Sequence, residues 1–173
     1  AERLHFAVHG LPNERRPELS ALALDAGDAG EDGRLEAWEI ARLRLDAELV
    51  VLSACRSALG REAAGEGLLG LTRAFFEAGA PRVLATLWAV DDRATATFMT
   101  RFYRRLARGE AAVAALAGAQ RETLAAGGLD AHPARWAAFV LDGDPGFAPP
   151  AQGPTSDQPP LEPRSKPSAK SAP

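Results

Sequence analysis

Cysteine is almost absent from this sequence, which has one, Cys55, among 173 residues. A single cysteine excludes an internal disulfide, so the fold depends on its apolar core. The net charge is also small, at -3, and this balance gives no sign of a nucleic acid or an anionic membrane as a partner. A lone thiol is easiest to maintain in a reducing compartment, and we take a cytoplasmic location as the default.

Long apolar runs, targeting signals and ligand motifs are missing as well. No run approaches the length of a membrane span, and the N-terminus lacks a basic segment followed by an apolar stretch. Histidine, cysteine and carboxylate residues do not cluster at metal-ligand spacing, and no glycine loop has a phosphate-binding pattern. We therefore expect a protein that needs neither a metal nor an organic cofactor.

The strongest feature that is present is the run LVVLSAC over residues 49–55. An unbroken apolar run of this kind is typical of a strand buried on both faces of a parallel sheet. Similar runs over 3–9 and 82–88 predict two further strands. Ligands of open α/β sheets bind at the carboxyl ends of such strands. If the first two strands are parallel neighbours, His9 and Cys55 lie side by side at that edge.

Between these strands, apolar residues recur at helical spacing. Strands and helices that alternate in this way predict an α/β sandwich with a mainly parallel sheet. Three strong strands are few for such a sheet, so we expect further strands upstream of this chain. Four helices are predicted: over 35–45, from Leu68 to a stop at Gly79, over 93–107 with Asp92 as N-cap, and over 110–126. A short edge strand is also predicted at 20–24, and a short helix or strand at 133–141.

The composition changes near residue 147, where Pro, Ser, Ala, Lys and Gln become dominant. Such a segment cannot bury enough apolar surface to offset the entropy lost on ordering. We therefore expect one folded domain over 1–146 and a disordered tail over 147–173.

A cysteine and a histidine at neighbouring strand ends suggest nucleophilic catalysis. An imidazole can take the proton of a thiol, which is a poor nucleophile on its own, and later give it to a leaving amine. The backbone N–H groups of Gly10 and Cys55 are candidates for stabilising the oxyanion. Considered singly, Cys55 would more often be a small buried residue, and His9 an ordinary partly buried histidine. His5 alternates with Phe6 and fits a packing or hydrogen-bonding residue better than a base.

Five short motifs then occur in an order that resembles a known family. Together they are similar to a CHAT domain, a caspase-like peptidase module often found in bacteria behind tetratricopeptide repeats. The resemblance covers roughly residues 3–143. The motifs are HFAVHG (5–10), LSAC (52–55), GEGL (65–68), RAF with AGA (73–75 and 78–80) and LWAVDD (87–92).

The resemblance implies a three-layer caspase-like sandwich and a cysteine endopeptidase that cleaves proteins under the control of repeat or other regulatory domains. The histidine before glycine is the general base in that clan, which implies His9 as the base and Cys55 as the nucleophile. The position two before the nucleophile, here Ser53, commonly lines the specificity pocket. Trp88 and Asp91 would lie on the opposite wall, where Asp91 is a candidate for selecting a basic residue before the scissile bond.

Two other functions fit part of the pattern. A non-catalytic CHAT-like scaffold or signalling module would keep the fold without the chemistry, although the presence of both His9 and Cys55 argues against it. A cysteine hydrolase of small esters or amides fits the two residues but not the series of motifs.

Overall fold

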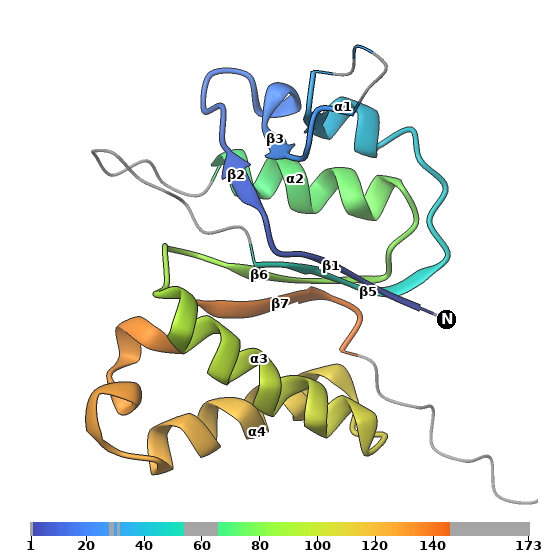
Figure 1. Ribbon diagram of the computed structural model, residues 1–173. Helices are drawn as coiled ribbons and strands as arrows, with labels where there is room; N and C mark the ends of the chain where they lie inside the picture. The colour runs from blue at the N-terminus through green and yellow to red at the C-terminus, as the bar shows by residue number, and fades with distance from the viewer. Residues whose placement is uncertain (1, 28–29, 31, 54–65, 146–173) are drawn as a thin grey trace, which may run out of the picture.

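The computed structural model describes residues 2–27, 30, 32–53 and 66–145 of the chain. In that part, a central sheet lies between two helical layers (Figure 1). Its strands are β1 (Glu2–Phe6), β5 (Ala47–Leu52), β6 (Arg82–Thr86) and β7 (Phe139–Gly143). Their order in space is β1-β5-β6-β7, and β7 alone runs antiparallel to its neighbour. The predicted α/β sandwich with a mostly parallel, caspase-like sheet is therefore confirmed.

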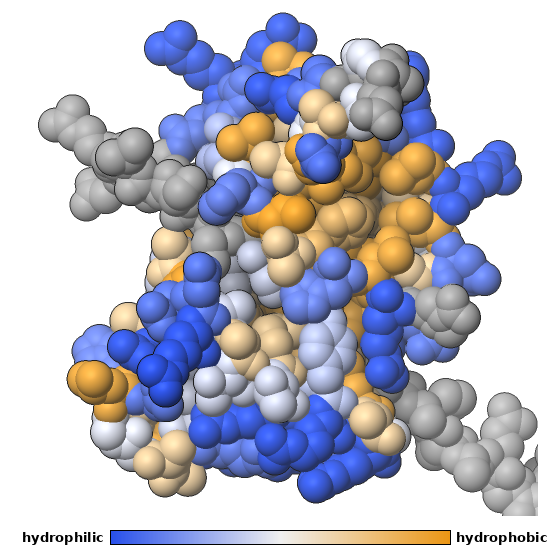
Figure 2. Space-filling model, viewed as in Figure 1, coloured by the Kyte–Doolittle hydropathy of each residue, from blue (hydrophilic) through white to orange (hydrophobic). Residues whose placement is uncertain are grey.

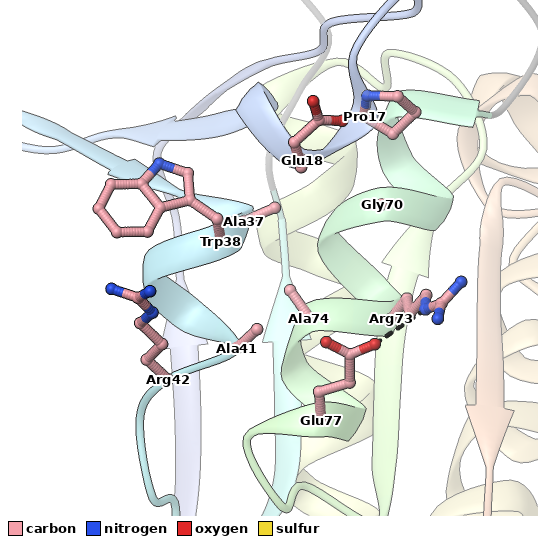
Figure 3. Close-up of a pocket in the computed structure, with 10 residues that line it drawn as sticks. All are labelled: Pro17, Glu18, Ala37, Trp38, Ala41, Arg42, Gly70, Arg73, Ala74 and Glu77. Atoms are coloured by element: carbon pink, nitrogen blue, oxygen red, sulfur yellow. Dashed lines mark hydrogen bonds and ion pairs between the residues drawn. The ribbon is translucent and has the colours of Figure 1, made fainter.

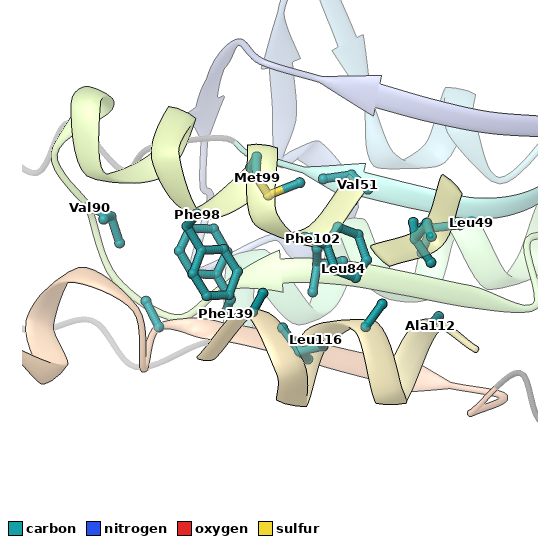
Figure 4. Packing of buried hydrophobic residues seen from close by; sticks show 14 of the residues in the cluster. Leu49, Val51, Leu84, Val90, Phe98, Met99, Phe102, Ala112, Leu116 and Phe139 are labelled. Carbon is teal, nitrogen blue, oxygen red and sulfur yellow. The ribbon is translucent and has the colours of Figure 1, made fainter. Parts of the chain in front are cut away.

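Two long helices, α3 (Asp92–Ala107) and α4 (Ala112–Ala125), cover one face of the sheet (Figure 1). The apolar stripe of α3 is buried, with Phe98 only 1% exposed. Its ring stacks on that of Phe139, with centroids 4.1 Å apart and planes 6° apart (Figure 4). This contact joins α3 to β7 in the core. Two 3-10 turns, η2 (Gly128–Ala131) and η3 (Pro133–Arg135), connect α4 to β7.

The opposite face is covered by α2 (Glu66–Glu77), which packs with α1 (Ala37–Ile40) and the 3-10 turn η1 (Pro17–Leu19). A second, antiparallel sheet lies on this side (Figure 1). Its described strands, in spatial order, are β2 (His9–Leu11), β3 (Ala21–Ala23) and β4 (Arg34–Glu36).

The interior strand β5 has the double-sided burial that its apolar run predicts. Leu49 and Val51 contribute to the core under α3 and α4, whereas Val50 and Leu52 contribute to the core under α2. Because successive strand residues point to opposite faces, a strand covered on both sides needs apolar residues at every position.

The prediction of one strand over 3–9 is wrong, because the structure has two strands there. β1 ends at Phe6, and β2 begins at His9 in the other sheet. The alternation of apolar residues continues across the break, since Leu4, Phe6 and Val8 all pack partly against the same core. Periodicity therefore gives no sign of the change of sheet. The segment at 20–24 also differs from expectation, because β3 pairs on both sides and is not an edge strand.

The helix predicted over 35–45 is reduced to the four residues of α1, which β4 precedes. Ile40 is buried in the core, but Trp38 is 42% exposed. The indole Nε1 of Trp38 donates to Oε2 of Glu36 at 2.5 Å, and the guanidinium of Arg42 lies 5.2 Å from the ring centroid. These partners hold the tryptophan at the surface, so the apolar spacing that suggests a long helix does not reflect a long buried face.

The surface seen in Figure 2 is divided. Apolar side chains gather over β1 and the α1–α2 layer, and hydrophilic ones dominate the α3–α4 layer. Within the described residues, no helix combines the length and apolar character that a membrane crossing needs. The predicted tail over 147–173 lies outside the described residues.

Replacing Gly143 with alanine is expected to lower the free energy of unfolding by about 1–3 kcal/mol more than replacing Gly109. Both glycines have positive φ, +95° and +84°, so each alanine carries a backbone penalty of about 1–2 kcal/mol. A Cβ at Gly143 would also overlap the carbonyl oxygen of Pro81 and lie 2.9 Å from Cε1 of Phe76, whereas a Cβ at Gly109 meets nothing within 4 Å. Urea denaturation of both variants measures the difference, and equal midpoints would contradict it.

Candidate active site

The parallel pairing of β1 with β5 places His9 near the carboxyl edge of the central sheet. Phe6 is the register partner of Leu52, and the Ser53 N–H donates to the Phe6 carbonyl at 3.0 Å. His9 follows Phe6 by three residues, which corresponds to at most about 11 Å of chain. Its side chain is exposed. The condition stated from the sequence, that the first two strands are parallel neighbours, is met.

Cys55 lies outside the described residues, together with the segment that follows it as far as residue 65. The described chain reaches Ser53, two residues earlier, so Cys55 is at most about 7 Å of chain from Ser53 and about 11 Å from the end of β5. The structure thus determines the sheet edge from which the chain continues to Cys55. The pairing of Cys55 with His9 stays a prediction.

Gly10 lies in β2, opposite Leu22 of β3. Among the described strands, β2 pairs with β3 only. The N–H groups of successive strand residues point in opposite directions, so the outer edge of β2 presents donors that this sheet does not use. The oxyanion role of Gly10 stays a prediction, and its place on an edge strand is compatible with it.

Ser53 is held by β1 through its side chain as well as through its backbone. A hydrogen bond of 2.8 Å joins Oγ of Ser53 to Nε2 of His5, 48 residues away in sequence. The ring of His5 also lies 5.6 Å from that of Tyr103 in α3, at an angle of 38°. His5 is therefore a hydrogen-bonding residue, as its alternation with Phe6 suggests, and its partner is one of the predicted pocket residues.

His5 is exposed and Tyr103 is half-buried, but partial desolvation still shifts the pKa values of both groups. Desolvation lowers the pKa of His5 below its usual value, which favours the neutral imidazole at pH 7. Desolvation also raises the pKa of Tyr103, while the positive charge of Arg3 opposes that shift. The His5 imidazole that contacts Ser53 and the Tyr103 phenol are therefore both uncharged near neutral pH, and Arg3 supplies the positive charge near Tyr103.

Trp88 and Asp91, predicted on the opposite wall, follow the end of β6. The indole Nε1 of Trp88 donates to the carbonyl of Ala134 at 3.0 Å, which fixes a half-exposed ring. Asp91 is the N-cap of α3, because its Oδ1 accepts from the Ala94 N–H at 3.0 Å. The sequence predicts Asp92 as this cap, and that prediction is wrong by one residue. Asp91 thus has a structural role whatever its part in substrate selection.

A separate hollow of about 500 Å³ lies between η1, α1 and α2 (Figure 3). Alanines form part of its floor, and the Arg73–Glu77 ion pair at 2.9 Å crosses one side. None of the predicted site residues that the structure describes lines this hollow. Among the described residues, no group of three or more histidines, cysteines or carboxylates is placed to hold a metal ion.

The fold and the sheet edge together define the class of this molecule, a caspase-like α/β domain in which a histidine-glycine pair follows the strand that pairs with the interior strand. Comparison with known families gives a match to the CHAT domain over residues 1–144. The chain belongs to the CHAT domain family.

Curated relatives are similar over part of the chain. Tetratricopeptide repeat protein 28 of Mus musculus is 42% identical over 109 residues, and tetratricopeptide repeat protein 28 of Homo sapiens is 38% identical over 109 residues. Each match covers 63% of this chain and 4% of the relative. The matched part is thus a small fraction of proteins named for their tetratricopeptide repeats, and the association of CHAT domains with such repeats is supported.

The residue that sequence reasoning did not connect to the site is His5. Its sequence position, four residues before His9, offers no direct signal that it contacts Ser53. The signal lies in the strand register: His5 is opposite Val51, so its ring lies on the same face as residue 53 and can reach it. The residue pairing between two strands can be predicted from their sequences only once the strands are known to be neighbours.

Proposed function

We propose that this protein is a cysteine endopeptidase of the caspase-like kind, with Cys55 as nucleophile and His9 as general base. The observation that supports the proposal most is the aligned ends of β1 and β5. The Phe6–Leu52 register and the Ser53–Phe6 hydrogen bond bring the two strands out at the same edge. Within a few residues of that edge, the first carries the histidine and the second the only cysteine of the chain.

The chemistry follows from the residue types. His9 takes the thiol proton of Cys55, and the thiolate attacks the carbonyl carbon of the scissile peptide. The N–H groups of Gly10 and Cys55 stabilise the oxyanion of the tetrahedral intermediate. The imidazolium then gives its proton to the leaving amine, and an acyl-enzyme remains. A water molecule, deprotonated by the same imidazole, hydrolyses the thioester and restores Cys55.

Ser53, Trp88 and Asp91 form the proposed walls of the pocket that receives the residue before the scissile bond. The substrate is a protein, and tetratricopeptide repeats or other regulatory domains are the proposed partners. The repeats in the name of the matched relatives support that association. The small net charge gives no sign of a nucleic acid or an anionic membrane as a partner, and neither is proposed. A cytoplasmic location is proposed from the unpaired thiol.

A non-catalytic scaffold or signalling module is the second candidate. It is favoured by the relatives' names, which describe repeats and no enzymatic activity. On that reading, the domain keeps its packed core while the thiol of Cys55 is an ordinary, unactivated one.

Covalent labelling separates the two candidates. We expect a tagged peptide acyloxymethyl ketone to modify the full chain once, at Cys55, with loss of its carboxylate, and the same probe to leave Cys55→Ala unmodified. His9→Ala should label far more slowly, and His132→Ala, which changes another exposed histidine, should label normally. Peptide mapping by mass spectrometry locates the label. If iodoacetamide modifies Cys55 but the peptide probe does not, the thiol is accessible without being activated, and the scaffold function is supported instead.

A further inference from the structure

His5 and Ser53 form a side-chain contact that includes neither of the two proposed catalytic residues. The Ser53 backbone is already held by its hydrogen bond to Phe6. The additional 2.8 Å bond from Nε2 of His5 to Oγ of Ser53 fixes only the direction of the hydroxyl. A side chain that restrains a hydroxyl at the border of a substrate pocket affects what the pocket accepts.

The imidazole that holds this hydroxyl is itself restrained. One nitrogen faces Ser53, and the ring lies 5.6 Å from that of Tyr103, whose own ring lies 5.6 Å from Phe102 in the buried stripe of α3. The contacts therefore run from the core through Tyr103 and His5 to Ser53. Each step uses an uncharged group, because partial desolvation lowers the pKa of the exposed His5 and raises that of Tyr103.

We propose that His5 is a positioning residue that orients the Ser53 hydroxyl, so that the pocket selects an uncharged, hydrogen-bonding side chain before the scissile bond. This inference rests on the proposed peptidase function and gives it a substrate class. A pocket wall with a fixed hydroxyl binds a substrate amide side chain more tightly, because the amide can form a hydrogen bond with that hydroxyl. It binds an apolar substrate side chain less tightly, because the hydroxyl is then left without a partner. A charged side chain would find no counter-charge in the His5–Ser53 pair.

Asp91 offers the competing specificity. Its carboxylate is negative and would favour a basic residue, but Oδ1 already accepts the Ala94 N–H at the start of α3. The two walls thus predict different substrates: an amide side chain if the His5–Ser53 pair dominates, and a basic one if Asp91 dominates.

Three fluorogenic peptides that differ only in the residue before the scissile bond, with glutamine, methionine or arginine, test the proposal in the full chain. We expect the wild-type protein to prefer glutamine to methionine, which has a similar length. Ser53→Ala and His5→Leu should each reduce that preference by about 2- to 10-fold, mainly through KM. The double variant should lose no more than either single one, because both remove the same hydrogen bond.

His5→Gln is the rescue variant, since an amide nitrogen or oxygen at a similar distance can bond to Ser53. It should recover most of the glutamine preference that His5→Leu loses. The rate at which iodoacetamide modifies Cys55 should be the same within about 2-fold in His5→Leu, His5→Gln and the wild type, because the positioning concerns the pocket and not the nucleophile. His132→Leu serves as the matched histidine control.

Several results would overturn the inference while leaving the peptidase proposal intact. These are an unchanged glutamine preference in His5→Leu, an equal slowing of all three peptides, or an arginine preference that survives His5→Leu and is lost in Asp91→Asn. By contrast, a wild-type chain that cleaves none of the peptides and shows no peptide-ketone labelling of Cys55 would reject the peptidase function, and the inference with it.

Discussion

Alkylation of Cys55 at pH 6 is expected to slow by about 10- to 100-fold when His9 is replaced by alanine. An ordinary thiol has a pKa of about 8.5, so only about 0.3% of it is thiolate at pH 6. A thiol that transfers its proton to a neighbouring imidazole is largely thiolate at pH 6. Because that thiolate is less basic, it is also a weaker nucleophile, so the alkylation rate rises less than the thiolate fraction does. Because the chain has one cysteine, the rate with iodoacetamide reports on this residue alone.

The pH profile distinguishes activation from simple exposure. The wild-type rate should stay high from pH 8 down to about pH 6, whereas the His9→Ala rate should fall roughly tenfold per pH unit below the ordinary thiol pKa. His132→Ala should behave as wild type, and the urea-unfolded chain gives the reference for an unassisted thiol. A wild-type profile that coincides with that of the unfolded chain would remove the proposed pair.

Replacing Phe98 with alanine is expected to lower the free energy of unfolding by about 3–5 kcal/mol. The ring is 1% exposed and stacks on Phe139 at 4.1 Å, so its loss leaves a cavity between α3 and the sheet and removes an aromatic contact. Such a loss is a large part of the total stability of a domain of this size. Urea denaturation followed by circular dichroism measures it.

Leu129→Ala provides the matched control, because this leucine in η2 is 77% exposed. Its substitution should change the free energy of unfolding by no more than about 0.5 kcal/mol. A loss in Phe98→Ala as small as that in Leu129→Ala would mean that the α3 face of the core is less well packed than the described contacts indicate.

The elements with a strong local pattern could be predicted from the sequence. The run over 49–55 gave the interior strand β5, and the stripe of Phe98, Phe102 and Leu106 gave α3 within one residue of its observed start. In each case, the residues of one segment are enough to predict its structure. A strand buried on both faces requires a continuous apolar run, and a helix buried along one stripe requires apolar residues at a fixed spacing. The five family motifs occur along the chain in the same order as in the CHAT family, and this order identified the fold.

The weaker segments were decided by their partners. The sequence predicts a buried side of α2 formed by Leu68, Leu69, Leu71, Phe75 and Phe76. This prediction is partly wrong, because Leu69 and Phe76 are exposed while Leu71 and Phe75 are buried. The short strand β3 is stable because it pairs on both sides, and neither β2 nor β4 has an apolar run of its own. Isolated three-residue strands have too few contacts to leave a clear local signal.

The sequence by itself determined the fold class, the family and the two candidate catalytic residues, because those depend on residue types in a fixed order along the chain. Only the tertiary structure decided that β1 and β5 end at the same edge, that Asp91 and not Asp92 caps α3, and that His5 bonds to Ser53. These last features depend on strand register and on where the chain bends in space. Contacts between residues 48 apart in sequence follow from the packing of whole elements, which no local pattern contains.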